Sequence, residues 1–334
     1  MQSRILNLSC RIEAHAKINV TLDVLGVRPD GYHDLSSVVM PVALHDDVVV
    51  SAIAGGTSAA EPSVIVEVVP EGVDISRIGP PDRNLCVKAA QAYFKAMSAT
   101  GAHRLPPRLD VRVVKRIPLG GGLGGGSADA AAVLAALDWM AARGAFGAGA
   151  KPLGEERLVA VAAEVGSDVP ALFLGGATLM EGRGERVRRL PGVFGTFDIL
   201  LANPGIHVST PEAFRALDAL PRDGEMLTKT RFSDNILTSR NCGKTLPGFA
   251  AMLSNGLEKA VFGLHPEIAR LAARLRDAGA RGVLMSGSGA TVFALAASPA
   301  EANALAGVLP AGCWSAVSQT VPDGVMAAHG PLEA

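Results

Sequence analysis

The sequence predicts an α+β fold from three features. Residues 109–114 alternate between apolar and polar side chains as a strand does, and residues 127–140 are rich in Ala and Leu as a helix is. Between these two segments, six of the seven residues from 120 to 126 are glycine. So many glycines destabilise a helix or a strand, because each loses much backbone entropy when it is ordered. Near the C-terminus, strands expected at 282–285 and 291–295 flank a glycine-containing turn, with a helical segment on either side. A strand–turn–strand unit between helices is typical of an α+β domain.

Composition excludes several classes of protein. The 334 residues carry a formal net charge of −1, which argues against nucleic acid as a partner. Apolar runs are interrupted by charge or glycine, so no membrane span is expected, and the first residues lack the apolar core of a signal peptide. The four cysteines are scattered without a CxxC pair. We therefore expect a cytoplasmic protein with reduced thiols and no metal cluster.

The N-terminal segment combines strands with polar side chains. Residues 9–24 are expected to form two strands, and the alternation places Lys17 and Asn19 on one face. Such a pair is usually the solvated side of a strand. A Pro-Asp-Gly turn then presents Tyr32 and His33 side by side. Taken alone, that pair is typical of a protein surface.

The remaining elements follow from periodicity and from turn residues. Further strands are expected at residues 48–53, 64–69, 176–181, 197–202 and 314–319. Further helices are expected at residues 84–97, 155–165, 266–278 and 299–308, and one more begins near Thr210 with Pro211 in its first turn. Ser298 is the expected N-cap of the last helix. The charged stretch 221–243 is expected to be a mobile loop.

The glycine run has the properties of a phosphate-binding loop. A strand leads into it and a helix leaves it, with Ser127 as the expected N-cap, so backbone N–H groups and the helix dipole face whatever the loop holds. A flexible linker is the alternative, although linkers rarely connect a strand tightly to a long apolar helix. A Walker A loop would require a lysine before Ser127, and a dinucleotide fingerprint would require an acidic residue farther along than Asp138.

Asp168 is a second candidate for chemistry. It lies two residues after Gly166 and two before Pro170, where a helix is not expected to continue. Its carboxylate therefore belongs to a loop, as a turn or cap residue or as a functional group.

The run from Pro118 to Ala131 resembles the ATP loop of the GHMP kinase superfamily of small-molecule kinases. The motif order is also similar to that superfamily: a lysine strand, the glycine loop and a Gly-Ser-Gly turn near the C-terminus. Five local sequences, at residues 16–19, 28–33, 166–170, 203–205 and 285–289, resemble the branch that acts on a cytidine diphosphate-linked polyol. The resemblance covers residues 14–295. The sequence departs from the branch pattern at Ser167, usually alanine, and at Ala128, often a second serine, so Ser127 alone would serve the phosphates.

The resemblance implies a two-lobed GHMP kinase fold. Residues 1–176 would form an N-terminal lobe with a mixed β-sheet and the phosphate loop, and residues 177–334 a ferredoxin-like C-terminal lobe. The implied reaction is ATP-dependent phosphorylation of the 2-hydroxyl of a cytidine diphosphate-linked methylerythritol in the non-mevalonate isoprenoid pathway. Kinases of the homoserine or mevalonate type, and a non-catalytic metabolite-sensing relative, are the alternatives. The oligomeric state is left open.

The resemblance also assigns residues to roles. Asp168 would orient the hydroxyl and accept its proton, with Lys17 assisting. Ser127 would contact Mg²⁺ or a phosphate oxygen. ATP would be bound by Pro118, Leu119, Gly120, Gly121, Gly122, Leu123, Gly124, Gly125, Gly126 and Ser127, with Asn84 and Lys115 reaching the nucleotide. The acceptor would be bound by Asn19, Tyr32, His33, Thr210 and Phe214, with Tyr32 and Phe214 stacking on the base.

Overall fold

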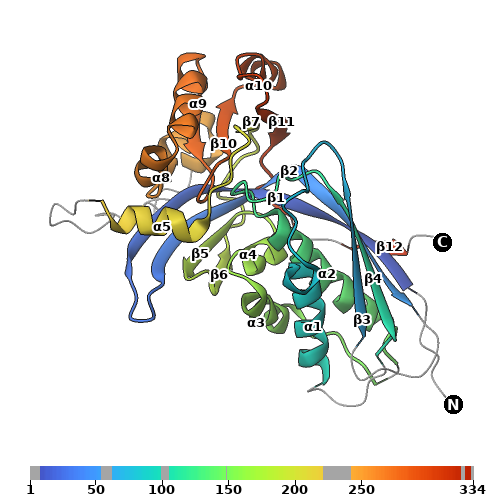
Figure 1. Ribbon diagram of the computed structural model, residues 1–334. Coiled ribbons are helices and arrows are strands. Elements are labelled where there is room, and N and C mark those ends of the chain that lie inside the picture. The colour runs from blue at the N-terminus through green and yellow to red at the C-terminus, as the bar shows by residue number, and fades with distance from the viewer. Residues whose placement is uncertain are drawn as a thin grey trace.

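The computed structural model has two lobes, each with its own sheet (Figure 1). It describes residues 8–53, 62–98, 105–147, 149–220, 242–324 and 328–331. Within these ranges, no helix combines the length and the apolarity that a membrane crossing requires. The expected loop at 221–243 lies outside the described residues up to position 241.

The larger sheet is mixed, as predicted. Its main path runs β12-β1-β2-β4-β3, with β3 parallel to β4 and the other neighbours antiparallel. β5 extends it by pairing with the first part of β2, β6 pairs with β5, and β8 pairs with β1. The strands are β1 (Leu8–Val27), β2 (His33–Ile53), β3 (Ser63–Pro70), β4 (Arg108–Lys115), β5 (Thr178–Gly182), β6 (Arg186–Arg189), β8 (Ser254–Asn255) and β12 (Ala328–Pro331).

The prediction of two strands over residues 9–24 is wrong, because β1 is one strand of 20 residues. Its antiparallel pairing with β2 continues through three register shifts, one of them between His15 and Lys17. A bulge bends a strand and tightens its twist without ending it. β2 likewise begins at His33, well before the expected start at residue 48.

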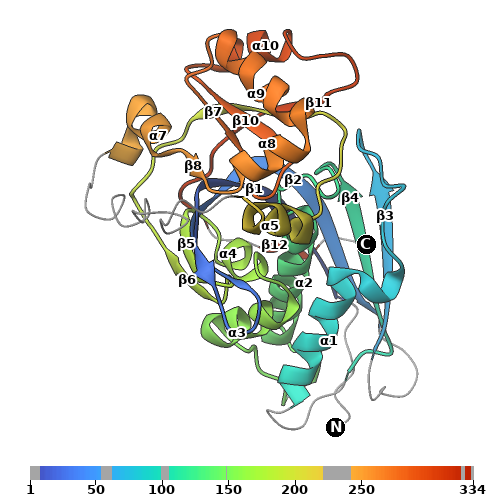
Figure 2. The same ribbon diagram turned by 60° about the vertical axis from the view of Figure 1, so that its left-hand side comes forward.

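Helices α1 (Leu85–Ser98), α2 (Gly125–Ala142), α3 (Glu155–Val165) and α4 (Val169–Leu174) lie together on one side of the larger sheet (Figures 1 and 2). Most residues of α2 are buried, and its many alanines let the sheet and α1 approach closely. Tyr93, Phe94 and Phe146 fill the space beside α2, with ring centroids 5.5–6.5 Å apart. The cluster lies toward the C-terminal end of α2, where Tyr93 Oη donates a hydrogen bond to Asp138 Oδ1 at 3.1 Å. A short 3₁₀ turn, Pro81–Arg83, precedes α1.

The smaller sheet has the strand order β11-β7-β10-β9 with every neighbour antiparallel. With the helices between its strands, this is the ferredoxin-like arrangement that was predicted. The strands are β7 (Asp198–Asn203), β9 (Gly282–Met285), β10 (Val292–Ala296) and β11 (Trp314–Gln319). The helices are α5 (Thr210–Asp218), α7 (Leu246–Met252), α8 (Glu258–Leu264), α9 (Pro266–Asp277) and α10 (Pro299–Ala306), with a 3₁₀ turn at Cys242–Lys244. Ser298 caps α10 as expected, because its hydroxyl accepts a hydrogen bond from Glu301 N at 3.2 Å.

A shared apolar cluster joins the two lobes. Ile18 and Met40 of the larger sheet pack in one buried group with Leu201, Phe293 and Phe249 of the C-terminal lobe. The predicted lobe boundary at residue 176 stays a prediction, and the larger sheet continues past that boundary into β5 and β6. The shared cluster fixes the position of the lobes on either side of the cavity described next.

Candidate active site

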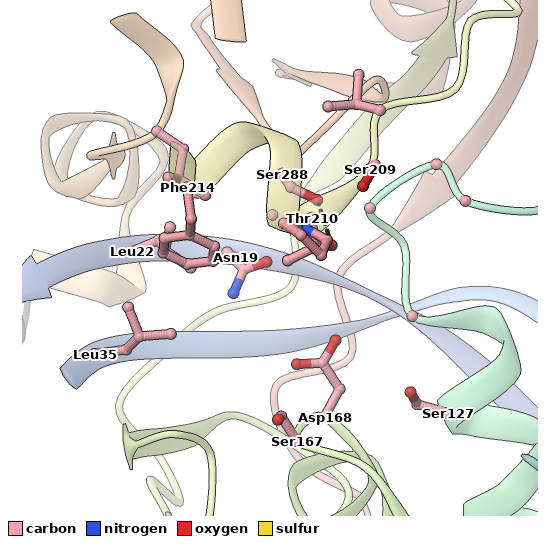
Figure 3. Close-up of a pocket in the computed structure, with 18 of the residues that line it drawn as sticks. Asn19, Leu22, Leu35, Ser127, Ser167, Asp168, Ser209, Thr210, Phe214 and Ser288 are labelled. Carbon is pink, nitrogen blue, oxygen red and sulfur yellow. Dashed lines mark hydrogen bonds between the residues drawn. The ribbon is translucent and has the colours of Figure 1, made fainter. Parts of the chain in front are cut away.

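A cavity of about 980 Å³ is lined by residues of both lobes (Figure 3). Its walls come from β1, the turn before β2, the glycine loop, the turn before α4, the β5–β6 turn, the start of α5 and the β9–β10 turn. The predicted site residues line this cavity except for Leu123, Asn84 and Lys115. Residues far apart in the sequence therefore meet in one cavity.

The glycine loop opens onto α2, but the helix begins earlier than predicted. Gly124 is the N-cap, with φ +68°, and its carbonyl accepts a hydrogen bond from Ala128 N at 2.9 Å. The prediction that Ser127 is the N-cap is therefore wrong, because Gly124 can adopt the left-handed conformation and the helix starts at Gly125. Ser127 lies in the first turn and lines the cavity (Figure 3). The N–H groups of that turn lack intrahelical partners and can bind an anion.

The β9–β10 turn supports the glycine loop from behind. Ser286 Oγ donates a hydrogen bond to Gly122 O at 2.9 Å, and Thr291 N donates one to Gly121 O at 3.1 Å. A Cβ on Gly122 would lie 2.2 Å from Ser286 O, so only glycine fits. The turn that contains the C-terminal Gly-Ser-Gly motif thus supports the backbone of the glycine loop.

Lys17 and Asn19 lie side by side on β1, as the alternation predicts. Lys17 Nζ donates a hydrogen bond to Asn19 Oδ1 at 2.7 Å and lies 3.4 Å from Asp168 Oδ2. The solvated-face interpretation of this pair is wrong, because Lys17 is 3% exposed and Asn19 1%. Gly287 covers them so closely that a Cβ there would be 3.4 Å from either side-chain tip.

Asp168 lies in a turn, as predicted, immediately before α4. Although it is the N-cap residue, its side chain makes no capping hydrogen bond to α4. The carboxylate instead points into the cavity, between Ser127 of α2 and Asn19 of β1 (Figure 3). The fold therefore presents this carboxylate, paired with Lys17, to the interior of the cavity.

The other end of the cavity has an aromatic wall. The His33 ring stacks on Phe214 of α5 with centroids 4.5 Å apart, and its Nε2 lies 3.1 Å from Asp218 Oδ1. Tyr32 is 56% exposed, and the Arg183 guanidinium carbon lies 3.8 Å from its ring centroid. One face of each aromatic ring is thus already in contact with a neighbour.

Thr210 and Ser288 bring α5 and the β9–β10 turn together. Their hydroxyl oxygens are 3.0 Å apart, and both residues line the cavity opposite Asp168 (Figure 3). These two hydroxyl groups belong to the C-terminal lobe, and at this position they can donate hydrogen bonds to a bound anion.

Lys115 and Asn84 line a second cavity, of about 140 Å³, which borders the same Leu119 and Gly126 as the large one. Lys115 is buried between Asp46 and Asp129, with Nζ–oxygen distances of 2.5 and 2.6 Å. Burial alone would lower the pKa of Lys115, but the two carboxylates outweigh burial and raise it. Lys115 therefore carries its charge in a structural network behind the glycine loop.

Two residues that were expected to contact the nucleotide, Asn84 and Leu123, form hydrogen bonds within the protein. Asn84 accepts a hydrogen bond from Cys86 N at 2.8 Å, which caps α1. Leu123 is buried in the cluster between the lobes, and its carbonyl accepts a hydrogen bond from Lys17 N at 3.0 Å. The apolar side chain of Leu123 therefore anchors the loop and does not line the cavity, and its place in an ATP loop stays a prediction.

Several residues that line the cavity were not predicted from the sequence. They include Leu22, Leu35, Arg183, His207, Ser209, Asp218 and Ser288. His207 lies against the glycine loop, where a Cβ on Gly120 would be 2.3 Å from its Nδ1. The available signals were turns: Arg183 stands between two glycines, and Ser288 belongs to the Gly-Ser-Gly motif. Neither turn indicated which side chains would face the cavity.

Comparison with known proteins agrees with this geometry. Residues 84–176 match the family model described as GHMP kinases N terminal domain, and residues 241–313 match GHMP kinases C terminal. A 4-diphosphocytidyl-2-C-methyl-D-erythritol kinase of Solibacter usitatus is 39% identical over 284 residues, covering 85% of this chain and 80% of the relative. The corresponding kinase of Deinococcus radiodurans is 38% identical over 315 residues, covering 92% and 91%.

Solved structures show the same fold. A crystal structure of 4-(cytidine 5'-diphospho)-2C-methyl-D-erythritol kinase matches with a TM-score of 0.69 and 31% identity, covering 93% of this chain and 99% of the other. A homoserine kinase from Cytophaga hutchinsonii matches with a TM-score of 0.64 at 19% identity, covering 96% of each chain, which supports the fold alone. Together with the family models and the sequence relatives, these matches show that the chain belongs to the 4-diphosphocytidyl-2-C-methyl-D-erythritol kinase family of GHMP kinases.

Proposed function

We propose that this protein transfers the γ-phosphoryl group of ATP to the 2-hydroxyl of 4-diphosphocytidyl-2-C-methyl-D-erythritol, a step of the non-mevalonate isoprenoid pathway. The observation that carries the proposal is the pairing of Lys17 with Asp168, 3.4 Å apart, beside the N-terminus of α2 in one cavity. A phosphate cradle and a positioned carboxylate are the two parts that phosphoryl transfer to an alcohol requires.

The triphosphate of ATP would lie along residues 118–127, with phosphate oxygens on the unpaired N–H groups of the first turn of α2. The smaller cavity next to Leu119, bordered by Asn84 and Lys115, would then accept the adenine end. His207, a residue of the C-terminal lobe, lies against Gly120, so its side chain would lie next to the phosphates. Both lobes would thereby contact the nucleotide.

Mg²⁺ would be held mainly by the phosphates. Ser127 offers a hydroxyl and Asp168 a carboxylate in the cavity, and oxygen ligands of this kind suit Mg²⁺. Among the described residues, Glu13, His45 and Asp47 are three side chains whose potential metal-ligand atoms lie close together. None of the three lines the cavity. When bound, the ion offsets the negative charge of the transferring phosphoryl group.

Asp168 would orient the acceptor hydroxyl and take its proton late. Because the alcohol becomes acidic only as its bond to phosphorus develops, a carboxylate suffices. Lys17 holds the carboxylate from one side and adds positive charge toward the γ-phosphoryl group. Asn19 fixes the lysine by accepting its hydrogen bond at 2.7 Å. The buried side chains on β1 therefore position the reacting group.

The cytidine end of the acceptor would occupy the aromatic end of the cavity. Tyr32 and Phe214 offer ring faces for stacking, and His33 offers ring nitrogens to the edge of the base. Thr210, at the start of α5, lies across the cavity from Asp168 (Figure 3). Since His33 already stacks on Phe214, base binding would involve the opposite face of Phe214 or a shift of the His33 ring.

A coupled assay of ATP consumption tests the proposal. The protein is given Mg·ATP with the cytidylated methylerythritol, homoserine or mevalonate in separate reactions. We expect turnover with the first acceptor at least a hundredfold above the other two. Turnover that is equal or greater with homoserine or mevalonate would reassign the acceptor. ATP binding without turnover of any of them would instead support the metabolite-sensing alternative.

A further inference from the structure

The β5–β6 turn places a charged side chain where no sequence feature indicated a role. Arg183 lies at its tip, lines the large cavity, and has a side chain that is 44% exposed. Its guanidinium carbon lies 3.8 Å from the ring centroid of Tyr32. Its nearest carboxylate among the described ion pairs is Asp30, at 3.7 Å, which is beyond hydrogen-bond distance.

Contacts on both sides hold the turn, so the fold determines where the backbone of Arg183 lies. Gly184 has φ +112°, and a Cβ on it would lie 2.4 Å from Ser167 O, the carbonyl before Asp168. Glu185 Oε2 accepts a hydrogen bond from Arg183 N at 2.5 Å, and Glu185 Oε1 lies 3.8 Å from Arg28 Nη1. The β5–β6 turn thus packs on one side against the turn that carries Asp168 and on the other side against the turn that carries Arg28 and Tyr32.

We propose that Arg183 binds the diphosphate of the cytidylated acceptor while its guanidinium stacks on Tyr32. A stacked guanidinium uses its face against the ring, and its five N–H donors remain in its plane. Those donors match phosphate oxygens, which arginine binds in bidentate geometry. The inference rests on the proposed function, because it presumes an acceptor with a diphosphate next to a base.

The charges around the cavity favour this assignment. Among the described residues that line it, the lysine and arginine side chains are Lys17, Arg183 and Arg215. Lys17 is engaged with Asn19 and Asp168. Arg183 is the one of these in contact with the ring expected to stack on the base. If the cytosine stacks on Tyr32, the diphosphate attached to its ribose would therefore lie within reach of the N–H donors of Arg183.

The test compares CDP with cytidine as ligands, by isothermal titration calorimetry, in wild type and the variants R183Q, R183K and R188Q. Arg188 is an exposed arginine on β6 that does not line the cavity, and it serves as the matched control. We expect R183Q to weaken CDP binding by about tenfold to a hundredfold and cytidine binding by less than about threefold, as for loss of a charge-assisted hydrogen bond. R183K should fall between R183Q and wild type, and R188Q should match wild type.

Three outcomes would overturn the inference. CDP affinity in R183Q within threefold of wild type would show that the arginine does not contact the diphosphate. Equal losses for CDP and cytidine would show that it acts only through Tyr32. A loss in R188Q equal to that in R183Q would show a general effect of surface charge.

Turnover separates this inference from the proposed function. If wild type does not phosphorylate the cytidylated methylerythritol, the proposed function fails and this inference fails with it. If wild type does so and R183Q retains the KM of wild type for that acceptor, this inference alone fails. We expect R183Q to raise the KM for the acceptor about tenfold or more and to leave the KM for ATP unchanged.

Discussion

Replacing Asp168 with asparagine is the most direct test of the proposed chemistry. The substitution keeps the shape of the side chain and removes its charge and its capacity to accept a proton. Asp168 makes no capping hydrogen bond to α4, so the local backbone does not depend on the carboxylate. Its carboxylate forms an ion pair with Lys17, with Oδ2 3.4 Å from Nζ.

The structure sets the size of the expected effects. At 3.4 Å and an effective dielectric constant of 20, Coulomb's law gives about 5 kcal/mol for the pair before desolvation is counted. The side chain of Asp168 is 28% exposed, and Lys17 keeps its hydrogen bond to Asn19. We therefore expect the free energy of unfolding to fall by only about 1–3 kcal/mol. Turnover should fall by about 10²–10⁴, the range for loss of a positioned acid–base group.

The assay measures kcat and the KM values for ATP and for the cytidylated acceptor, together with urea unfolding. Asp110→Asn is the control, because Asp110 pairs with Arg108 on the surface of β4 and does not line the cavity. The double variant Lys17→Met/Asp168→Asn should lose less than the sum of the single losses, because the two residues act as a unit. A folded Asp168→Asn protein with kcat within threefold of wild type would refute the mechanism.

Three further predictions follow from individual contacts. Gly124→Val should raise the KM for ATP at least about tenfold, since φ is +68° there and a Cβ would lie 3.1 Å from Lys17 Cγ; unchanged ATP affinity in a folded variant would argue against the phosphate cradle. Lys115→Met should lower the free energy of unfolding by about 3–5 kcal/mol, measured in urea, because two buried carboxylates lose their cation; a loss under 1 kcal/mol would contradict the network. Burial lowers the pKa of His15, despite opposing contributions from the Val42 carbonyl and Glu13. The unfolded chain then binds more protons than the folded one below about pH 6.5, so stability is lost as pH falls through that window. His15→Gln should flatten this dependence between pH 7.5 and 5.5, and an unaltered slope would exclude His15 as its source.

Much of the candidate site was predictable because short local motifs carry it. The glycine run, Lys17 with Asn19, and Asp168 each stand in a stretch whose spacing or turn chemistry marks it. The ferredoxin-like order of the second sheet also agrees with the predicted element order. Small elements escaped prediction: α4 has six residues and β6 has four, too few for a period to appear.

Other features depended on contacts between distant segments. Bulges leave no mark in composition, so the continuous course of β1 through the shift at His15 was not apparent. Arg183 stands between two glycines with no periodic pattern around it, and only the hairpin of β5 and β6 brings it to Tyr32. Side-chain direction at a turn is set by what packs behind it, as Ser167 does behind Gly184.

The sequence by itself determined the local chemistry of this protein: a glycine loop at a helix start, an alternating strand with a lysine, and a carboxylate in a turn. These are short-range properties, since backbone freedom at glycine, strand period and turn propensity act over a few residues. Only the tertiary structure decided that Lys17 is 3% exposed and 3.4 Å from Asp168, a residue about 150 positions along the chain. Burial and the meeting of charges depend on how the lobes pack around their shared apolar cluster, which no local pattern specifies.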